Sequence, residues 1–324
     1  MDMADLDQRK IRKQDKLLVN EAYKRGVKFQ NISDKRFRMS YGNQSYIVRN
    51  GNVRDSSSAP LAIRVIKMKD VTSRILRNRG YNGIENTVFD HKDLVRAWYW
   101  ASTILPVVLK PASGKLGKLV YVNINNYEEF KKHFEKIARK YTDILVEKYI
   151  EGEEYRFTYL NNQIITINRN IPAHVIGDGE QTINELIAFK NKEREKSPVY
   201  KKIKVNKESE RILSYQGYNL ESVPEMNKRV FVRKTSNLST GGEAIDVTDD
   251  ISEDIKEHVR KAINSIKGIF LCGADVLISE DKPYIMEINS LPGLLTDDYL
   301  EEDKPRHVIK KVVDEMFPET VEGK

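Results

Sequence analysis

The first part of the chain combines one helical pattern of hydrophobic positions with strand-like patterns. Leu18 and Ala22 fall at helical spacing, and Gly26 follows them as a helix stop. Alternating residues on both sides of a turn at 42–43 then predict a β-hairpin. We therefore expect residues 1–65 to form a short N-terminal αβ segment.

From residue 66 onward the pattern changes to amphipathic helices that alternate with short apolar strands. The predicted elements are helices at 69–80, 91–103 and 126–141 and a hairpin of strands at 106–109 and 120–122. This arrangement predicts a small α+β lobe over residues 66–145, with helices packed on an antiparallel sheet.

Residues 146–324 are predicted to form a larger α+β lobe. Its expected elements are paired strands near 155–160 and 163–168, a short helix opened by a capping box at 182–185, a helix at 252–267, paired strands at 273–278 and 283–288, and a C-terminal helix at 306–316. A basic insertion at 190–211 carries nine Lys and Arg against four Asp and Glu, a local net charge of +5.

Composition narrows the class of protein. The 324 residues are 40% hydrophobic and 9% aromatic, too apolar for a disordered chain. No apolar run reaches the ~20 residues that span a bilayer, and the charged N-terminus lacks the apolar core of a signal peptide, so a cytoplasmic location is expected. The single cysteine, Cys272, excludes an intrachain disulfide. The net charge of +7 is compatible with nucleic acid, with an anionic small molecule, or with solubility alone.

Three oxygen-bearing side chains fall on two predicted neighbouring strands. Glu287 and Asn289 are two residues apart and share one face of a strand, and an antiparallel partner can bring Asp275 opposite them. Such hard oxygen ligands suit magnesium that bridges phosphates. The alternative is a solvated sheet edge with ordinary surface acids, but acids within an apolar sheet must be paired or metal-bound. We therefore favour a metal site.

Two further segments carry candidate chemistry. Lys110 ends a buried strand and precedes a small-residue loop with Gly114 and Gly117, which can close over phosphate oxygens, although a simple β-turn is an equal alternative. The stretch from Glu147 to Glu154 can offer main-chain groups to a flat base and a carboxylate to a ribose. From these residues alone, an ordinary acidic turn is the favoured interpretation there.

These elements follow the order and spacing of the ATP-grasp superfamily, which the chain resembles from about residue 67 to 293. Within it, the chain resembles the ligase domains of cyanophycin synthetase and of bifunctional glutathione synthetase. The shared stretches are IPAHVIGDG at 171–179, NLSTGG at 237–242 and AIDVTD at 244–249. The resemblance implies an ATP-grasp fold of class α+β or α/β, in which two α+β lobes grip ATP between them.

The resemblance also implies roles for individual residues. The implied ATP-binding residues are the two phosphate lysines Lys69 and Lys110, the phosphate-covering loop with Ser113, Gly114 and Gly117, the adenine linker of Glu147, Lys148, Tyr149 and Ile150, and the ribose-binding Glu154. The implied ligands of magnesium, with two ions expected and manganese as a substitute, are Asp275, Glu287 and Asn289. D-alanine ligases place a phosphoryl-stabilising Arg where this chain has Gly273, so Arg156 or Arg233 is expected to take that catalytic role.

The implied activity is an ATP-dependent carboxylate–amine ligase that forms an amide or peptide bond through an acyl phosphate and releases ADP and phosphate. The expected partners are small carboxylates and amines, such as amino acids or short peptides, without nucleic acid or membrane; a homodimer is left open. Two alternatives remain. An ATP-grasp kinase would transfer phosphoryl groups, and a basic module would bind nucleic acid through residues 190–211, although no RNA-binding motif accompanies that stretch.

Overall fold

The structure is a computed structural model that describes residues 13–33, 36–49, 52–55, 60–113, 119–299 and 306–321. Contacts divide the chain into two compact units. Unit 1 consists of Met1–Ile84, Tyr155–Asn168 and Asp246–Lys324, and unit 2 consists of Glu85–Glu154 and Arg169–Ile245. This division differs from the sequence ranges 1–65, 66–145 and 146–324, which stay a prediction about lobes.

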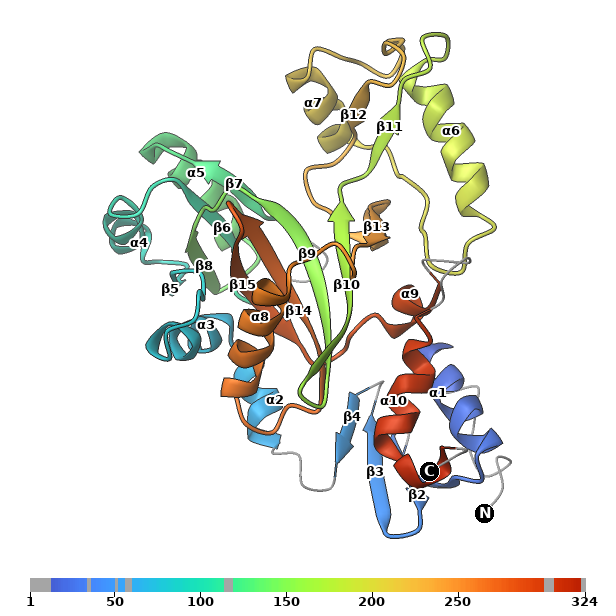
Figure 1. The fold of residues 1–324 in the computed structure, drawn as a ribbon. Helices are drawn as coiled ribbons and strands as arrows, with labels where there is room; N and C mark the ends of the chain where they lie inside the picture. The colour runs from blue at the N-terminus through green and yellow to red at the C-terminus, as the bar shows by residue number, and fades with distance from the viewer. Residues whose placement is uncertain are drawn as a thin grey trace. The chain divides into compact units, whose positions relative to one another are not determined.

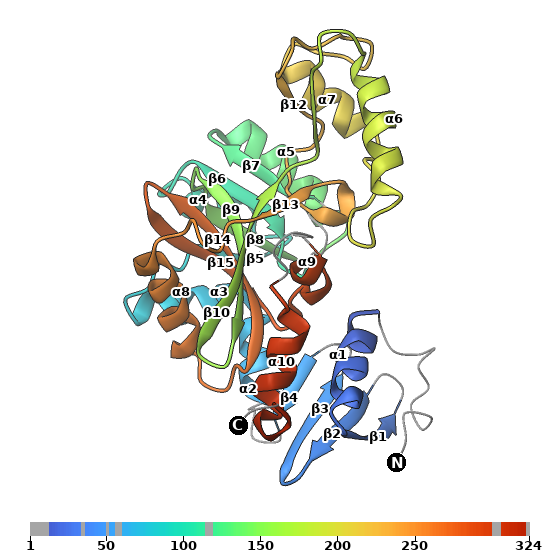
Figure 2. The same ribbon diagram turned by 45° about the vertical axis from the view of Figure 1, so that its right-hand side comes forward.

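One core of unit 1 joins segments from both ends of the chain (Figures 1 and 2). Its elements are α1 (Lys13–Lys24), the antiparallel sheet β1 (Lys28–Ser33), β2 (Arg36–Tyr41), β3 (Gln44–Arg49) and β4 (Asn52–Asp55), and the C-terminal α9 (Leu294–Tyr299), α10 (Val308–Met316) and η3 (Pro318–Thr320). Helix α10 packs against α1, and Arg25 forms an ion pair with Asp314. The predicted hairpin and C-terminal helix are confirmed.

The second core of unit 1 lies between a five-stranded sheet and three helices. The sheet has the order β13 (Glu243–Asp246), β10 (Gln163–Ile171), β9 (Glu153–Leu160), β14 (Leu271–Ser279) and β15 (Lys282–Asn289), and the helices are α2 (Pro60–Ile66), α3 (Lys69–Asn78) and α8 (Glu253–Ser265). Phe157, Cys272 and Ala274 face these helices. Since side chains alternate along a strand, Arg156 and Asp275 lie on the opposite face.

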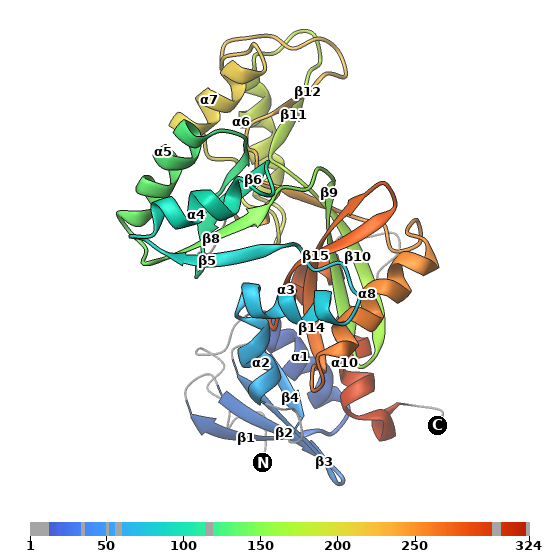
Figure 3. The same ribbon diagram turned by 90° about the vertical axis from the view of Figure 1, so that its left-hand side faces the viewer.

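Unit 2 contains a four-stranded antiparallel sheet with two helices on one face (Figure 3). The strand order is β5 (Asn86–Asp90), β8 (Asp143–Lys148), β6 (Val107–Pro111) and β7 (Tyr121–Ile124), and the helices are α4 (Leu94–Ala101) and α5 (Tyr127–Ala138). Leu109 and Val146 are fully buried against the helices. Alternation therefore places Lys110 and Glu147 on the other face of this sheet.

The rest of unit 2 is a small helical substructure around a two-stranded ribbon. Its elements are β11 (His174–Ile176), β12 (Arg229–Phe231), α6 (Ile183–Arg194), α7 (Lys207–Tyr215) and the short η2 (Leu238–Thr240). Thr182 and Glu185 form the predicted capping box of α6. The basic insertion covers the end of α6 and the start of α7, and both Lys190 and Arg194 form ion pairs with Glu243. None of the described helices is long and apolar enough to cross a membrane.

Candidate functional site

The two acids predicted to face each other are direct partners in the β14–β15 ladder. Asp275 pairs with Glu287 next to a register shift at Asp275/Val276. The side-chain amide nitrogen of Asn289 donates to Glu287 Oε1 at 2.7 Å and to Asp275 Oδ2 at 3.2 Å. The structure therefore brings all three predicted metal ligands into one hydrogen-bonded cluster.

Each acid of this cluster also has a cationic partner in unit 1. Arg156 from β9 binds both carboxylate oxygens of Asp275, with Nη2 3.0 Å from Oδ2. Lys69 Nζ, from the first turn of α3, lies 2.6 Å from Glu287 Oε2. Burial opposes the charge on Glu287, but the Lys69 ammonium and the hydrogen bonds from Lys69 and Asn289 outweigh it and lower the pKa of Glu287 to about 2.

Gly273 makes room for Arg156. A Cβ atom at Gly273 would stand 3.1 Å from Arg156 Cδ and 3.2 Å from its Nη1, closer than an ordinary carbon contact. Gly273 is the position at which the resemblance places an Arg in D-alanine ligases. In this chain the guanidinium beside Gly273 belongs to Arg156 on the neighbouring strand β9, and the missing side chain at Gly273 leaves the space for it.

The donor set of the cluster fits a hard divalent cation. Two carboxylates and one amide oxygen are the ligand types that magnesium prefers. No group of three or more His, Cys, Asp or Glu side chains among the described residues is arranged to hold a metal ion. The third protein oxygen at this cluster belongs to the Asn289 amide, which contacts both acids. Its amide nitrogen faces both carboxylates here, and ligation therefore requires the amide to turn its oxygen toward them.

A second polar cluster lies in unit 2 on the helix-free face of the four-stranded sheet. Lys110 Nζ binds Glu147 Oε1 at 2.7 Å, and the two side chains are only 13% and 4% exposed. Asn86 is the ladder partner of Glu147. Glu147 Oε2 and both polar side-chain atoms of Asn86 are buried and have no hydrogen-bond partner in the described part of the chain. Buried polar atoms without a protein partner are uncommon, and these atoms are free to bond a polar group of a ligand or a water molecule.

Glu154, the predicted ribose-binding acid, is held by two side chains of unit 2. Asn170 Nδ2 donates to its Oε1 at 3.3 Å, and the Ser236 hydroxyl donates to its Oε2. The N–H groups of Lys148 and Tyr149 donate to the carbonyls of Glu85 and Pro106, both at 2.8 Å. These two N–H groups are therefore not free to bind a base, which limits any main-chain contact from Lys148 and Tyr149 to their carbonyls.

The NLSTGG stretch forms a tight turn in which both glycines are required. Gly241 has φ of +98°, and a Cβ atom there would meet Ile203 at 2.9 Å. A Cβ atom at Gly242 would stand 2.7 Å from the carbonyl oxygen of Ser236. The turn fixes the backbone next to Ser236 and therefore next to Glu154.

The remaining predicted residues lie apart from these contacts or outside the described residues. Arg233 binds the carbonyl oxygen of Lys204 at 2.7 Å and Glu208 Oε2 at 3.4 Å, all within unit 2. Ser113 is exposed in the turn after β6, whereas Gly114 and Gly117 lie outside the described residues. Ile150 lies two residues beyond the end of β8 at Lys148.

Sequence reasoning missed three polar residues at or near these clusters. Asn86 and Ser236 are described above; the third is Asp297 on α9. Its buried carboxyl accepts hydrogen bonds from Thr158 Oγ1 at 2.8 Å and Asn168 Nδ2 at 2.5 Å. Burial raises the pKa of Asp297 to about 6, although these hydrogen bonds and the Arg156 charge oppose the shift. The two consecutive acids in the short segment after Gly293 were the available signal.

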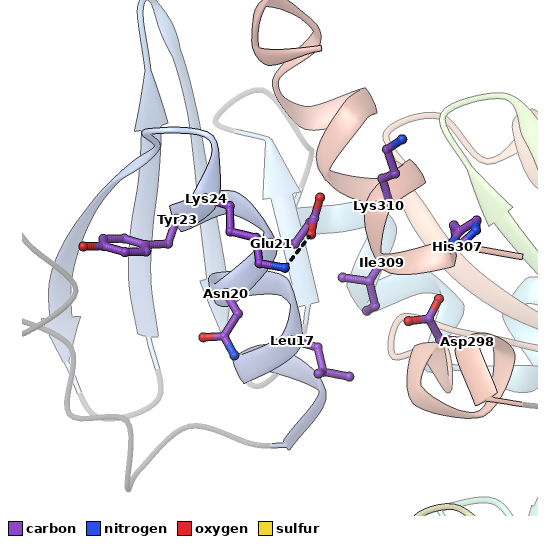
Figure 4. Close-up of a pocket in the computed structure, with 9 residues that line it drawn as sticks. All are labelled: Leu17, Asn20, Glu21, Tyr23, Lys24, Asp298, His307, Ile309 and Lys310. Atoms are coloured by element: carbon purple, nitrogen blue, oxygen red, sulfur yellow. Dashed lines mark ion pairs between the residues drawn. The ribbon is translucent and has the colours of Figure 1, made fainter. Parts of the chain in front are cut away.

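A cavity of about 500 Å³ in unit 1 does not involve the predicted residues (Figure 4). It lies among α1, α9 and α10, and its polar lining includes Glu21, Lys24, Asp298 and Lys310. Lys24 and Glu21 form an ion pair at 3.8 Å.

Comparison with known proteins decides the family. A protein-family model described as an ATP-grasp domain matches residues 94–293, more than half of the chain. The chain belongs to the ATP-grasp family.

Similar proteins fall within the groups that the sequence resembles. This ATP-grasp chain is 34% identical to cyanophycin synthetase of Synechocystis over 279 residues, covering 81% of the chain and 32% of that protein. It is 30% identical to the bifunctional glutathione biosynthesis protein of Clostridium perfringens over 317 residues, covering 93% of the chain and 40% of that protein. The chain thus spans about a third to two-fifths of the length of these relatives.

Solved structures give the same result for the fold. A bifunctional glutathione synthetase from Pasteurella multocida matches with a TM-score of 0.68 and 25% identity, over 95% of this chain and 44% of that one. D-alanine–D-alanine ligase from Bacillus anthracis shares the fold, with a TM-score of 0.51 and 18% identity over 81% of this chain and 70% of that one. The predicted ATP-grasp fold is confirmed, and the roles of individual residues stay predictions.

Proposed function

We propose that this ATP-grasp protein is an ATP-dependent ligase that joins a carboxylate to an amine through an acyl phosphate. The observation that carries the proposal is the pairing of Asp275 and Glu287 in one ladder, with Arg156 and Lys69 bound to them. Two acids and two cations at one place suit a polyphosphate that arrives with a divalent cation. Family membership makes ATP the expected nucleotide.

In this proposal the two units carry different parts of ATP recognition. Lys69 and Arg156 in unit 1 bind phosphate oxygens, and Lys110 in unit 2 contributes a further cation. The polar atoms of Asn86 and Glu147 that lack partners are available for the base. The Ser236 hydroxyl donates a hydrogen bond to Glu154, and a ribose hydroxyl donates a bond of the same kind. In this proposal the ribose therefore replaces Ser236 as the partner of Glu154.

Asp275, Glu287 and Asn289 would hold magnesium, or manganese as a substitute, and the bound ion would neutralise charge on the phosphates. The charges of Asp275, Glu287, Arg156 and Lys69 sum to zero, so a bare ion would compete with two cations already in place. A nucleotide supplies phosphate oxygens as new partners for those cations. We therefore expect metal affinity to rise when the nucleotide is present, which manganese electron paramagnetic resonance can measure with and without ADP.

In the proposed reaction a substrate carboxylate oxygen attacks the γ-phosphorus, and the bond from that phosphorus to the bridging oxygen of ADP breaks. The amine nitrogen then attacks the acyl carbon, phosphate leaves, and the nitrogen loses a proton to solvent or a base. Protein groups mainly position the reactants and stabilise charge. Arg156 is the better placed of the two candidate arginines, since it contacts Asp275, whereas Arg233 binds Glu208.

The decisive experiment measures ADP release over a panel of amino acids and short peptides offered singly and in pairs. The names of the similar proteins, cyanophycin synthetase and glutathione biosynthesis protein, support this choice of panel. A ligase releases ADP at a high rate only when a carboxylate and an amine are both present. ADP release with one hydroxyl-bearing acceptor, accompanied by a phosphorylated product, would instead establish the kinase alternative.

A further inference from the structure

Unit 2 contains a second cavity, separate from the Lys110–Glu147 contact. Its volume is about 350 Å³, within the usual range for small-molecule sites. It lies between α7 and the segment that contains β12, and its lining residues are Pro172, Ile212, Tyr215, Gln216, Phe231, Arg233 and Lys234.

The walls of this cavity are mainly apolar. Ile212 is buried, and Pro172 and Phe231 complete the apolar surface. Tyr215 is 74% exposed, so its ring is accessible to a ligand at the cavity. These side chains suit an aromatic or branched apolar group.

Arg233 and Lys234 place two positive charges on the lining. The terminal nitrogens of Arg233 are fixed by Glu208 and by the carbonyl oxygen of Lys204. Its side chain is only 11% exposed, and its Nε–H is buried without an acceptor among the described residues. Lys234 Nζ lies 5.7 Å from the centre of the Tyr215 ring. The side chains of Arg233 and Lys234 therefore give this part of the lining a positive charge that attracts an anionic group.

Gln216 excludes an extended peptide strand as the occupant. Its side chain accepts from the Phe231 N–H at 3.0 Å and donates to the Phe231 carbonyl at 2.8 Å. These two bonds take the place of a neighbouring strand, so the edge of β12 cannot add one at this residue. The cavity therefore suits a side chain or a small molecule.

The chain connects this cavity closely to the predicted ribose-binding acid. Arg233 is three residues before Ser236, which donates to Glu154. Three residues span at most about 11 Å, which is comparable to the length of a small substrate.

We propose that this cavity binds a carboxylate that carries an aromatic or branched apolar side chain, with the carboxylate at Arg233 and Lys234 and the side chain against Tyr215, Ile212 and Phe231. The identification of this ligand as a ligation substrate rests on the proposed function. The cavity thereby selects which acids are used.

Three probes test the two halves of the site separately, by NMR titration of the full chain. The first probe, 3-phenylpropanoate, carries both a carboxylate and an aromatic group. Propanoate carries only the carboxylate, and 3-phenylpropan-1-ol carries only the aromatic group. We expect 3-phenylpropanoate to bind at least about tenfold more tightly than either of the others. Equal affinity for the two carboxylates would overturn the proposal.

Two variants on α7 provide a matched comparison. Tyr215→Glu adds a carboxylate to the lining, where it competes for Arg233 and Lys234, and Ser214→Glu adds the same charge at an exposed position outside the lining. We expect Tyr215→Glu to weaken 3-phenylpropanoate binding at least about tenfold and Ser214→Glu to change it less than about twofold. The same small effect in both variants would contradict the site.

The subsite and the ligase activity fail in different ways. Selective binding without ADP release for any pair of acid and amine would reject the ligase activity and leave the subsite standing. ADP release whose kcat/KM ratio for phenylalanine against alanine is the same in wild type and Tyr215→Glu would reject the subsite and leave the ligase activity standing.

Discussion

The polar clusters of the two units differ in how completely their side-chain atoms are paired with other protein groups. In unit 1, Asp275 and Glu287 are each bound by a cation and by Asn289. In unit 2, Lys110 binds one oxygen of Glu147, while the second oxygen and both polar atoms of Asn86 have no partner among the described residues.

In the unit 1 cluster the acids are already neutralised by bound cations. The unit 2 cluster is a preformed site, in which polar atoms are already in place and open to a ligand. A ligand at the unit 1 cluster has to replace existing ion pairs, so the cluster is stable without it. A ligand at the unit 2 cluster completes hydrogen bonds that the protein leaves open, each of which costs about 1–3 kcal/mol in stability. Changes in unit 1 should therefore lower turnover, and changes in unit 2 should trade nucleotide affinity against stability.

The largest expected effect comes from Glu287→Gln, which removes the charge that Lys69 and a metal ion require. ADP release should fall at least about 1,000-fold, or about 4 kcal/mol in activation free energy. The control Glu280→Gln makes the same change at an exposed position in the β14–β15 turn, where turnover should be unchanged. Retained turnover in Glu287→Gln, with a normal circular dichroism spectrum, would remove the metal assignment.

Asp297 should make the stability of unit 1 depend on pH. Because its pKa is raised to about 6, the folded protein retains a proton that the unfolded chain releases near pH 4. Wild type should therefore lose about 3 kcal/mol relative to Asp297→Asn as pH rises from about 4 to 6, and no more above that. Urea unfolding of both proteins across this range measures the difference. A constant difference would contradict the raised pKa.

In unit 2, the double variant Lys110→Met with Glu147→Gln removes the ion pair without leaving a buried charge unpaired. ATP affinity should fall about 10–30-fold, since a charge-assisted contact with phosphate is lost. Lys131→Met, at an exposed position of α5, is the control. Calorimetric titration that gives equal affinities for all three proteins would reject the role of Lys110.

The Asn86→Leu variant should change protein stability and ATP affinity in opposite directions. The substitution removes two buried polar atoms without partners, so the free energy of unfolding should rise by about 1 kcal/mol. The same variant should bind ATP several-fold more weakly if the base uses these atoms. Thermal unfolding and calorimetry measure the two effects, and a destabilised variant with normal affinity would contradict the preformed site.

The smallest expected effect comes from Gly273→Ala, which crowds Arg156 without touching the acids. We expect kcat to fall about threefold to tenfold, which corresponds to about 1 kcal/mol. Gly293→Ala is the matched control, because its new Cβ would meet Thr296 at an ordinary 3.5 Å. Similar kcat values in both variants would mean that Arg156 does not act in turnover.

The period and spacing of apolar residues in the sequence were sufficient to predict the elements that bury one face. The hairpin of β14 and β15 and the facing of Asp275 and Glu287 follow from strand alternation, and the capping box of α6 follows from Thr182 and Glu185 alone. Helix α2 and strand β5 were not predicted, since both are short and lack a clear period.

The side-chain contacts of the site could not be predicted, because they depend on strand pairing that the sequence does not record. Arg156 reaches Asp275 because β9 lies beside β14, strands separated by more than 100 residues. Asn86 is opposite Glu147 only through the β5–β8 ladder. The basic insertion was considered as a nucleic-acid-binding stretch, but two of its cations, Lys190 and Arg194, bind Glu243; these two cations stabilise the fold.

The packing of α1 against α10 has a consequence for the order in which the chain folds during synthesis. Arg25 and Asp314 are 289 residues apart, whereas the last residue of unit 2 is Ile245. Domains fold as their segments leave the ribosome, so unit 2 can fold while the core around α1 still lacks its final helix. Until then the apolar face of α1 is uncovered, and a nascent chain that stalls before residue 308 should be the form most prone to chaperone binding.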